Sequence, residues 1–333
     1  IFFLVYVLIY TSLRDRENVH TLLNFYIFIV FIVVAIGVFQ FVALGHRVLT
    51  STFRHIYALN EMGDRLGVSN PWIDRSAVGH EHLGAYMVIA ASIVGSMVFA
   101  RWPADGWKRL YLALLWFGCM FTLVVSSSRG AWIGGVCALA VLTWFAFRRG
   151  QMIRLLGGLL GGICLFVAVQ AWSGLNIIEY IEGRVVDLLA IFSGQILDDS
   201  AQQRISTLQA QGRIFANYPL LGLGPGGAGR IAEGQFMREL IEGGIVGGFL
   251  FLLVMFSCGR MALRSYRLSD DRLVQGVSLG FVCSLVGLFG QSFFTELFLL
   301  TKIGVTFWAL AAVVHRLYVL NLAEKDAGAM VGR

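Results

Sequence analysis

The residue types best suited to chemistry gather where a glycine-rich loop meets the start of an apolar helix. The loop spans Asn217–Gly227 (NYPLLGLGPGG), and the charged segment that follows it spans Glu233–Gly247 (EGQFMRELIEGGIVG). A carboxylate can accept a proton, and an arginine can hold an anionic group. Charge at a membrane boundary costs free energy, so this cluster indicates a function, and we expect chemistry on a lipid-linked substrate.

The elements that must position this cluster are membrane helices. The chain of 333 residues is 57% hydrophobic and 14% charged, with a mean hydropathy of +0.74, which excludes an ordinary soluble enzyme. About 20 apolar residues span a bilayer as a helix, and lipid offers no water to unpaired backbone groups. We predict an all-α, polytopic transmembrane domain over residues 1–333 with about nine helical segments: Ile1–Leu13, Thr21–Gly45, Leu83–Ala100, Leu110–Ser128, Gly130–Phe147, Leu155–Ile178, Gly243–Gly259, Leu273–Thr295 and Ile303–Val314.

Lysine and arginine counts orient these segments. One set of alternate connections carries 15 Lys and Arg against 7 Asp and Glu, whereas the other carries 11 against 13. The positive-inside rule puts the first set in the cytoplasm. That set comprises Ser12–Leu22, Arg101–Arg109, Arg148–Arg154, Arg260–Arg272 and the tail after His315.

Two long loops are predicted on the opposite, outer side, over residues 45–82 and 173–236. Loops of this length are usually functional or disordered, and the second contains a predicted short helix that begins near Asp198 and Ser200. The chain would start on the outer side without a Met, so we expect one or more N-terminal helices to precede it.

The sequence predicts no metal and no cofactor. His80 and His82 flank Glu81, but no third ligand accompanies them, so a substrate hydrogen bond or interfacial packing is the better interpretation of this pair. The glycine-rich loop lacks the Lys-Ser/Thr of a nucleotide-binding loop. Its glycines, Gly222 and Gly224 among them, either present backbone amides to a phosphate or only close a tight bend.

Four segments carry a family resemblance by their order along the chain. They are an Arg…Gly stretch that leads into a helix (Arg75–Tyr86), SSSRGAWIG (Ser126–Gly134), Arg204 followed by Pro-Leu-x-Gly-x-Gly (Pro219–Gly224), and Glu-x-Gly-x-x-Gly (Glu242–Gly247). This order resembles the O-antigen ligase and Wzy-type polysaccharide polymerase superfamily of bacterial envelopes. The resemblance implies a GT-C-like glycosyltransferase of the bacterial inner (cytoplasmic) membrane, with its active site facing the periplasm.

One position departs from the ligase pattern. Many ligases of the superfamily carry His-Asn shortly before the Glu-x-Gly element, whereas this chain has Glu233-Gly234 there. Polymerases vary more at this site, so the resemblance favours a polymerase.

The resemblance also implies the reactants. The donor and the acceptor would be oligosaccharides linked to undecaprenyl pyrophosphate, with a chain-length regulator as a further partner and no nucleic acid. Arg129 and Arg204 would hold the pyrophosphate, because a guanidinium binds phosphate oxygens bidentately and stays charged. Glu233 would take the proton of the attacking hydroxyl or orient the acceptor.

Each arginine also has a structural interpretation. Arg129 could extend from a helix end to the interface, Arg204 could pair with a nearby aspartate, and Arg75 could bind loop carbonyls. Arg213 follows Arg204 by nine residues, which puts it on the opposite face of a helix unless that helix breaks, for example at Gly212.

The acidic residues have structural interpretations as well. Glu233 could serve only as an acidic group near a helix N-terminus. Arg238 and Glu242 stand four residues apart, which predicts an ion pair, or a clasp that aims Arg238 at the site.

Three alternatives to a polymerase remain open. A ligase would transfer the finished glycan to lipid A core or to protein. A lipid-linked glycan transporter would show internal repeats and broken helices, and the sequence shows no such symmetry. A structural or signalling membrane protein would not need these arginine motifs.

Overall fold

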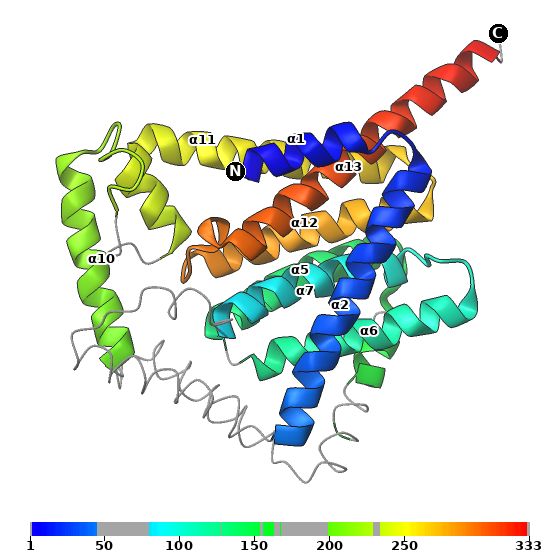
Figure 1. The fold of residues 1–333 in the computed structure, drawn as a ribbon, viewed down its shortest axis with the longest axis horizontal. Coiled ribbons are helices and arrows are strands. Elements are labelled where there is room, and N and C mark those ends of the chain that lie inside the picture. The colour runs from blue at the N-terminus through cyan, green and yellow to red at the C-terminus, as the bar shows by residue number, and fades with distance from the viewer. Residues whose placement is uncertain are drawn as a thin grey trace.

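The computed structural model describes residues 2–44, 80–126, 128–153, 156–162, 167, 199–228 and 234–331, and these ranges consist of helices joined by turns and loops, with no strand (Figure 1). The helices are α1 (Phe2–Ser12), α2 (Arg16–Leu44), α5 (His80–Phe99), α6 (Gly106–Val125), α7 (Arg129–Arg148), α10 (Asp199–Asn217), α11 (Gln235–Leu268), α12 (Arg272–Ser292), the 3-10 turn η1 (Leu297–Leu299) and α13 (Thr301–Val331).

Seven of these helices are long and apolar enough to cross a membrane, which confirms an all-helical, multi-pass protein: α2, α5, α6, α7, α11, α12 and α13. They correspond to seven of the nine predicted segments. The eighth, α1, has only 11 residues, and the ninth, Leu155–Ile178, lies mostly outside the described residues. The count of nine spans and the GT-C-like architecture therefore stay predictions.

Two helices are at least twice as long as the uncharged runs that predicted them. The run at Gly243–Gly259 lies inside α11, which has 34 residues, and the run at Ile303–Val314 lies inside α13, which has 31. Charged residues mark where a helix leaves the apolar layer, but they do not stop its backbone from continuing. In Figure 1 the end of α13 projects beyond the other helices.

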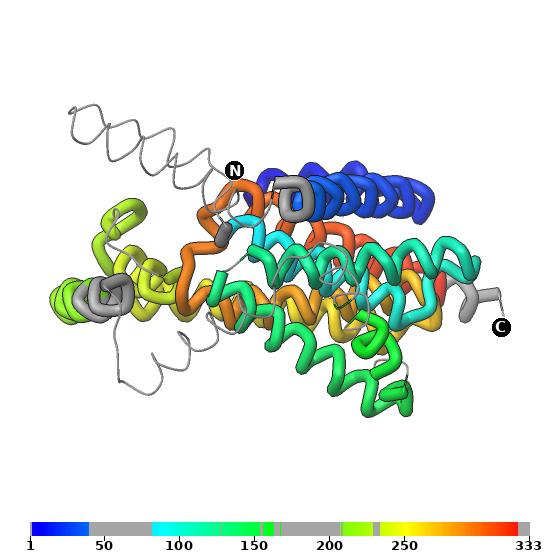
Figure 2. Tube along the Cα trace, turned by 90° about the horizontal axis from the view of Figure 1, so that it is seen from below, coloured from blue at the N-terminus to red at the C-terminus, as the bar shows by residue number. Residues whose placement is uncertain are grey.

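Helix α12 lies at the centre of the bundle. Helices α5, α7, α11 and α13 pack against it, and α12 and α5 are the most buried of the seven spans. Figure 2 shows α2 on one face of the molecule and α7 on the opposite face, with α12 between them. The crossing of α7 and α12 is very close, because a Cβ on Gly134 would lie 2.6 Å from the carbonyl oxygen of Gly287. Small residues at such crossings let membrane helices approach each other.

We predict that Gly134→Ala destabilises the folded protein, because the added methyl group would overlap the backbone of α12. Overpacking of this kind costs about 1–3 kcal/mol. Thermal unfolding in detergent measures the effect as a lower unfolding temperature. Gly212→Ala, on α10, is the matched control because a Cβ there meets nothing within 4 Å. Equal unfolding temperatures for the two variants would contradict the close crossing.

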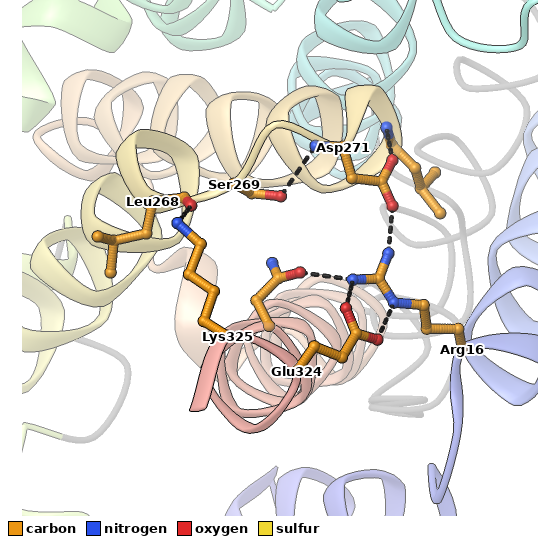
Figure 3. A network of polar contacts seen from close by, with 8 residues as sticks. Arg16, Leu268, Ser269, Asp271, Glu324 and Lys325 are labelled. Atoms are coloured by element: carbon orange, nitrogen blue, oxygen red, sulfur yellow. Dashed lines mark hydrogen bonds and ion pairs between the residues drawn. The ribbon is translucent and has the colours of Figure 1, made fainter. Parts of the chain in front are cut away.

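The predicted cytoplasmic segments meet at one end of the bundle, here called the basic end. Arg16 contacts Asp271, and it also binds Glu324 (Nε–Oε1 2.8 Å) and Asn321 (Nη2–Oδ1 2.6 Å), while Lys325 donates to the carbonyl of Leu268 (Figure 3). These contacts join the start of α2, the α11–α12 turn and the end of α13.

Two further contacts bring in the remaining segments: His20 with Trp102 (ring centroids 6.1 Å apart) and Arg149 Nη1 with Gln275 Oε1 (2.9 Å). The grouping of these segments on one side is confirmed.

Arg16→Gln should lower the unfolding temperature, because it removes the guanidinium that joins three helix ends. Hydrogen bonds to charged groups contribute about 1.5–3 kcal/mol each when they are sheltered, and the partial exposure of this network reduces that contribution. Thermal unfolding of Arg260→Gln, an exposed arginine of α11, provides the comparison. If the two variants unfold at the same temperature, the Arg16 network contributes nothing specific.

Candidate functional site

Helix α11 is broken near its start, at the end of the bundle opposite the basic end. Gly244 has φ 62° and ψ −161°, far from helical values, and it separates a short first segment from the long apolar one. A break in a helix frees backbone N–H and C=O groups, and in a membrane protein these groups need other partners.

The loop Pro219–Gly224, here called the strap, supplies those partners. In an unbroken helix, Ile245 and Val246 would donate to Ile241 and Glu242. Instead, the strap pairs with these donors and acceptors through four backbone hydrogen bonds. It donates from Leu223 N–H to Ile241 C=O (2.8 Å) and from Gly224 N–H to Glu242 C=O (2.9 Å). It accepts at Pro219 C=O from Ile245 N–H (2.8 Å) and at Leu220 C=O from Val246 N–H (3.3 Å). The strap and α11 are therefore joined by an exchange of backbone bonds.

Two glycines make this close approach feasible. A Cβ on Gly222 would lie 2.5 Å from the carbonyl oxygen of Ile241, and one on Gly244 would lie 2.3 Å from that of Leu220. Both residues also have positive φ, which glycine adopts without steric cost. The N–H groups of Gly222 and Gly224 are engaged within the protein, by the carbonyls of Tyr218 and Glu242. In this conformation the two glycines position the strap through backbone hydrogen bonds, and their predicted contact with a phosphate stays a prediction.

Arg238 lies just before the break and binds two carboxylates. Its Nη1 is 2.7 Å from Glu242 Oε1, and its Nη2 is 3.0 Å from Glu296 Oε2. The predicted pair of Arg238 and Glu242 is thus confirmed. The three side chains are only 14%, 19% and 23% exposed, in the order Arg238, Glu242 and Glu296.

Glu296 is the site residue that sequence reasoning missed. It lies in the short connection between α12 and η1, where a single carboxylate stands in a stretch from Phe293 to Leu300 that is apolar apart from Thr295. That isolation in the sequence was the available signal. Burial raises the pKa of Glu296 above its usual value, while the hydrogen bond from Arg238 opposes the rise.

Gln235 fixes the first turn of α11 against the same connection. Its buried side chain donates to Glu239 Oε1 (2.7 Å) and accepts from the backbone N–H of Phe298 (3.1 Å). Gly234, immediately before it, lies so close to α12 that a Cβ would be 2.8 Å from the carbonyl oxygen of Phe293. The start of α11 and the end of α12 are therefore held together.

Arg129 begins α7 at this same end of the bundle. Ser128 caps the helix, with its Oγ 3.3 Å from the N–H of Ala131. Gly130 packs against the end of α12, where a Cβ would lie 3.3 Å from Cβ of Phe294. The dipole of α7 disfavours a cation in its first turn, so an anion near Arg129 would be doubly stabilised. The starts of α5, α7 and α11 and the end of α12, here called the site end, form the candidate site.

Of the other predicted site residues, His82 lies at the site end and Arg213 lies on α10. His82 is partly buried in the first turn of α5, whose Gly84 packs against Ala131 of α7, so it belongs to the site end. Arg213 is exposed on α10, which runs from Asp199 to Asn217 without a break at Gly212. The helix predicted in this loop is confirmed, and the break that would bring Arg213 beside Arg204 is absent.

Several predicted residues lie outside what the structure describes. Glu233 and Arg75 are outside the described residues altogether. For His80 and Arg204 the backbone is helical, but their side chains are not described. Their predicted roles stay predictions.

No group of three or more His, Cys, Asp and Glu side chains suited to a metal occurs among the described residues. Four cysteines in the described part of the chain are free and at least partly buried, as expected for small apolar side chains: Cys119, Cys137, Cys258 and Cys283.

Comparison of the sequence with protein-family models and with curated proteins finds no match. The geometry of the site end and the order of motifs along the chain therefore support a functional proposal.

We predict that Gly244→Ala releases the strap, because the methyl group would overlap the Leu220 carbonyl and because alanine favours a continuous helix by roughly 0.5–1 kcal/mol. Hydrogen–deuterium exchange should show faster exchange at the amides of Leu223 and Gly224. Gly243→Ala is the matched control, since a Cβ there meets nothing within 4 Å. Unchanged exchange in the Gly244 variant would show that the backbone bonds do not hold the strap.

Proposed function

We propose that this protein is a glycosyltransferase that joins oligosaccharide repeat units carried on undecaprenyl pyrophosphate, at the periplasmic face of the bacterial inner membrane. The observation that carries the proposal is the gathering of Arg129, Arg238 and Glu296 at one end of an apolar bundle whose other end is basic. Charged groups partly sheltered at a membrane boundary are costly, which favours a functional reason for them.

The proposed chemistry needs a cation for the pyrophosphate and a base for the acceptor hydroxyl. Arg129 is the candidate cation, because it stands at a helix N-terminus where an anion is favoured and its guanidinium can bind two phosphate oxygens. Arg204 keeps the pyrophosphate-binding role that the family resemblance implies, and Glu233 keeps the role of orienting the acceptor. Arg238 is bound by two carboxylates, so we assign it to the support of the site and not to direct phosphate binding.

Reconstitution of the purified protein with lipid-linked repeat units tests the proposal. A ladder of lengthening products supports a polymerase, whereas transfer only to lipid A core or to protein supports a ligase. If neither product forms while the protein stays folded, the proposal fails.

Arg129→Gln should lower the transfer rate by about 10²-fold, the loss typical of removing one donor that stabilises developing charge. Product ladders from proteoliposomes give the rate, and Arg260→Gln, at an exposed position of α11, serves as the control. A wild-type rate in the Arg129 variant would remove this residue from the mechanism.

One observation favours a second function, that of a lipid-linked glycan transporter. Broken helices are frequent in transporters, and α11 is broken at Gly244. The break is only nine residues after the first residue of a 34-residue helix, near its end and not in the middle of the span. Movement of lipid-linked glycan across proteoliposomes without formation of new glycosidic bonds would favour the transporter.

A further inference from the structure

We infer that Glu296 accepts the proton of the attacking sugar hydroxyl, a role that rests on the proposed glycosyl transfer. Glu296 lies at the site end, in the connection that joins α12 to η1 and that Gln235 ties to the start of α11. Glu296 thus contacts Arg238 of α11 and follows Phe294, which packs against Gly130 of α7, by two residues.

The two oxygens of the Glu296 carboxylate have different surroundings. Oε2 is 3.0 Å from Arg238 Nη2, which fixes the orientation of the group. Oε1 is buried and has no hydrogen-bond partner among the residues that the structure describes. A carboxylate oxygen that is buried beside a cation and still lacks a partner needs an explanation, and a hydroxyl donor from a substrate supplies one.

The neighbouring carboxylates do not share this arrangement. Glu242 Oε1 is bound by Arg238 at 2.7 Å, and Glu239 Oε1 is bound by Gln235 at 2.7 Å. Among the described carboxylates, Glu296 is the one with a buried oxygen that still lacks a partner.

Burial also makes Glu296 a better base than an exposed glutamate. Its pKa is raised mainly by desolvation, against the opposing hydrogen bond from Arg238. A base works best when its pKa approaches the working pH, so the rise increases its readiness to hold a proton.

In the proposed step the acceptor O–H bond breaks and its proton moves to Oε1. The hydroxyl oxygen then forms a bond to the anomeric carbon of the donor. The bond from that carbon to the pyrophosphate oxygen breaks, and its electron pair leaves with the polyprenyl pyrophosphate. The proton bound to Glu296 is released to water or to the leaving group, which restores the carboxylate.

Glu296→Gln and Glu242→Gln form a matched pair for the test. Each replaces one of the two carboxylates on Arg238 by an amide of nearly the same shape, so a purely structural role predicts similar losses for both. For a base, Glu296→Gln should lower kcat by at least about 10²-fold, the lower range for acid–base catalysis, with donor affinity changed by less than about twofold. Glu242→Gln should lower kcat by less than about tenfold.

The measurements are product ladders in proteoliposomes, binding of the lipid-linked donor, and thermal unfolding of each variant. If Glu296→Gln does not fold, Glu296→Asp keeps a carboxylate set back by one methylene group and should retain donor binding with a lower kcat. Equal losses in the two glutamine variants, or full turnover in Glu296→Gln, would overturn the inference while the wild-type ladder still supports the proposed function. A wild-type protein that forms no glycosidic bond would overturn both.

Discussion

Backbone groups that are cut off from water must pair inside the protein, and the break in α11 depends on this requirement. The strap meets it by exchanging four backbone hydrogen bonds with the helix, so that the donors and acceptors freed on either side of Gly244 are satisfied. The same exchange holds Glu242 in place, and Glu242 binds Arg238, which binds Glu296. The backbone hydrogen bonds of the strap therefore also help to fix the positions of the charged side chains at the site end.

The two ends of the bundle use charge differently. At the basic end, Arg16 and Lys325 join helix ends to one another, which stabilises the arrangement of the spans. At the site end, charged groups are partly buried around a broken helix, and one carboxylate oxygen of Glu296 has no partner among the described residues. Buried unpaired atoms occur at both ends, Asn321 Nδ2 at the basic end among them, but among the described carboxylates only Glu296 has such an oxygen.

Several parts of the fold were predictable because they follow from local composition. Uncharged runs predicted seven spans correctly, lysine and arginine counts grouped the basic connections, and the spacing of Arg238 and Glu242 predicted their ion pair. The ends of α11 and α13 were not predictable in this way, since a helix continues past the apolar layer once its charged side chains reach water. The contact of Glu296 with Arg238 was missed because the two residues are distant along the chain.

The sequence by itself determined that this is a multi-pass helical membrane protein with a polar loop beside one apolar helix. Hydrophobic length and charge are local properties, so one sequence suffices to establish them. Only the tertiary structure decided that the glycines of Pro219–Gly224 insert into the hydrogen bonds of α11, and that Arg238 is shared by two carboxylates. Both features depend on contacts between segments distant in the chain, which residue spacing alone does not encode.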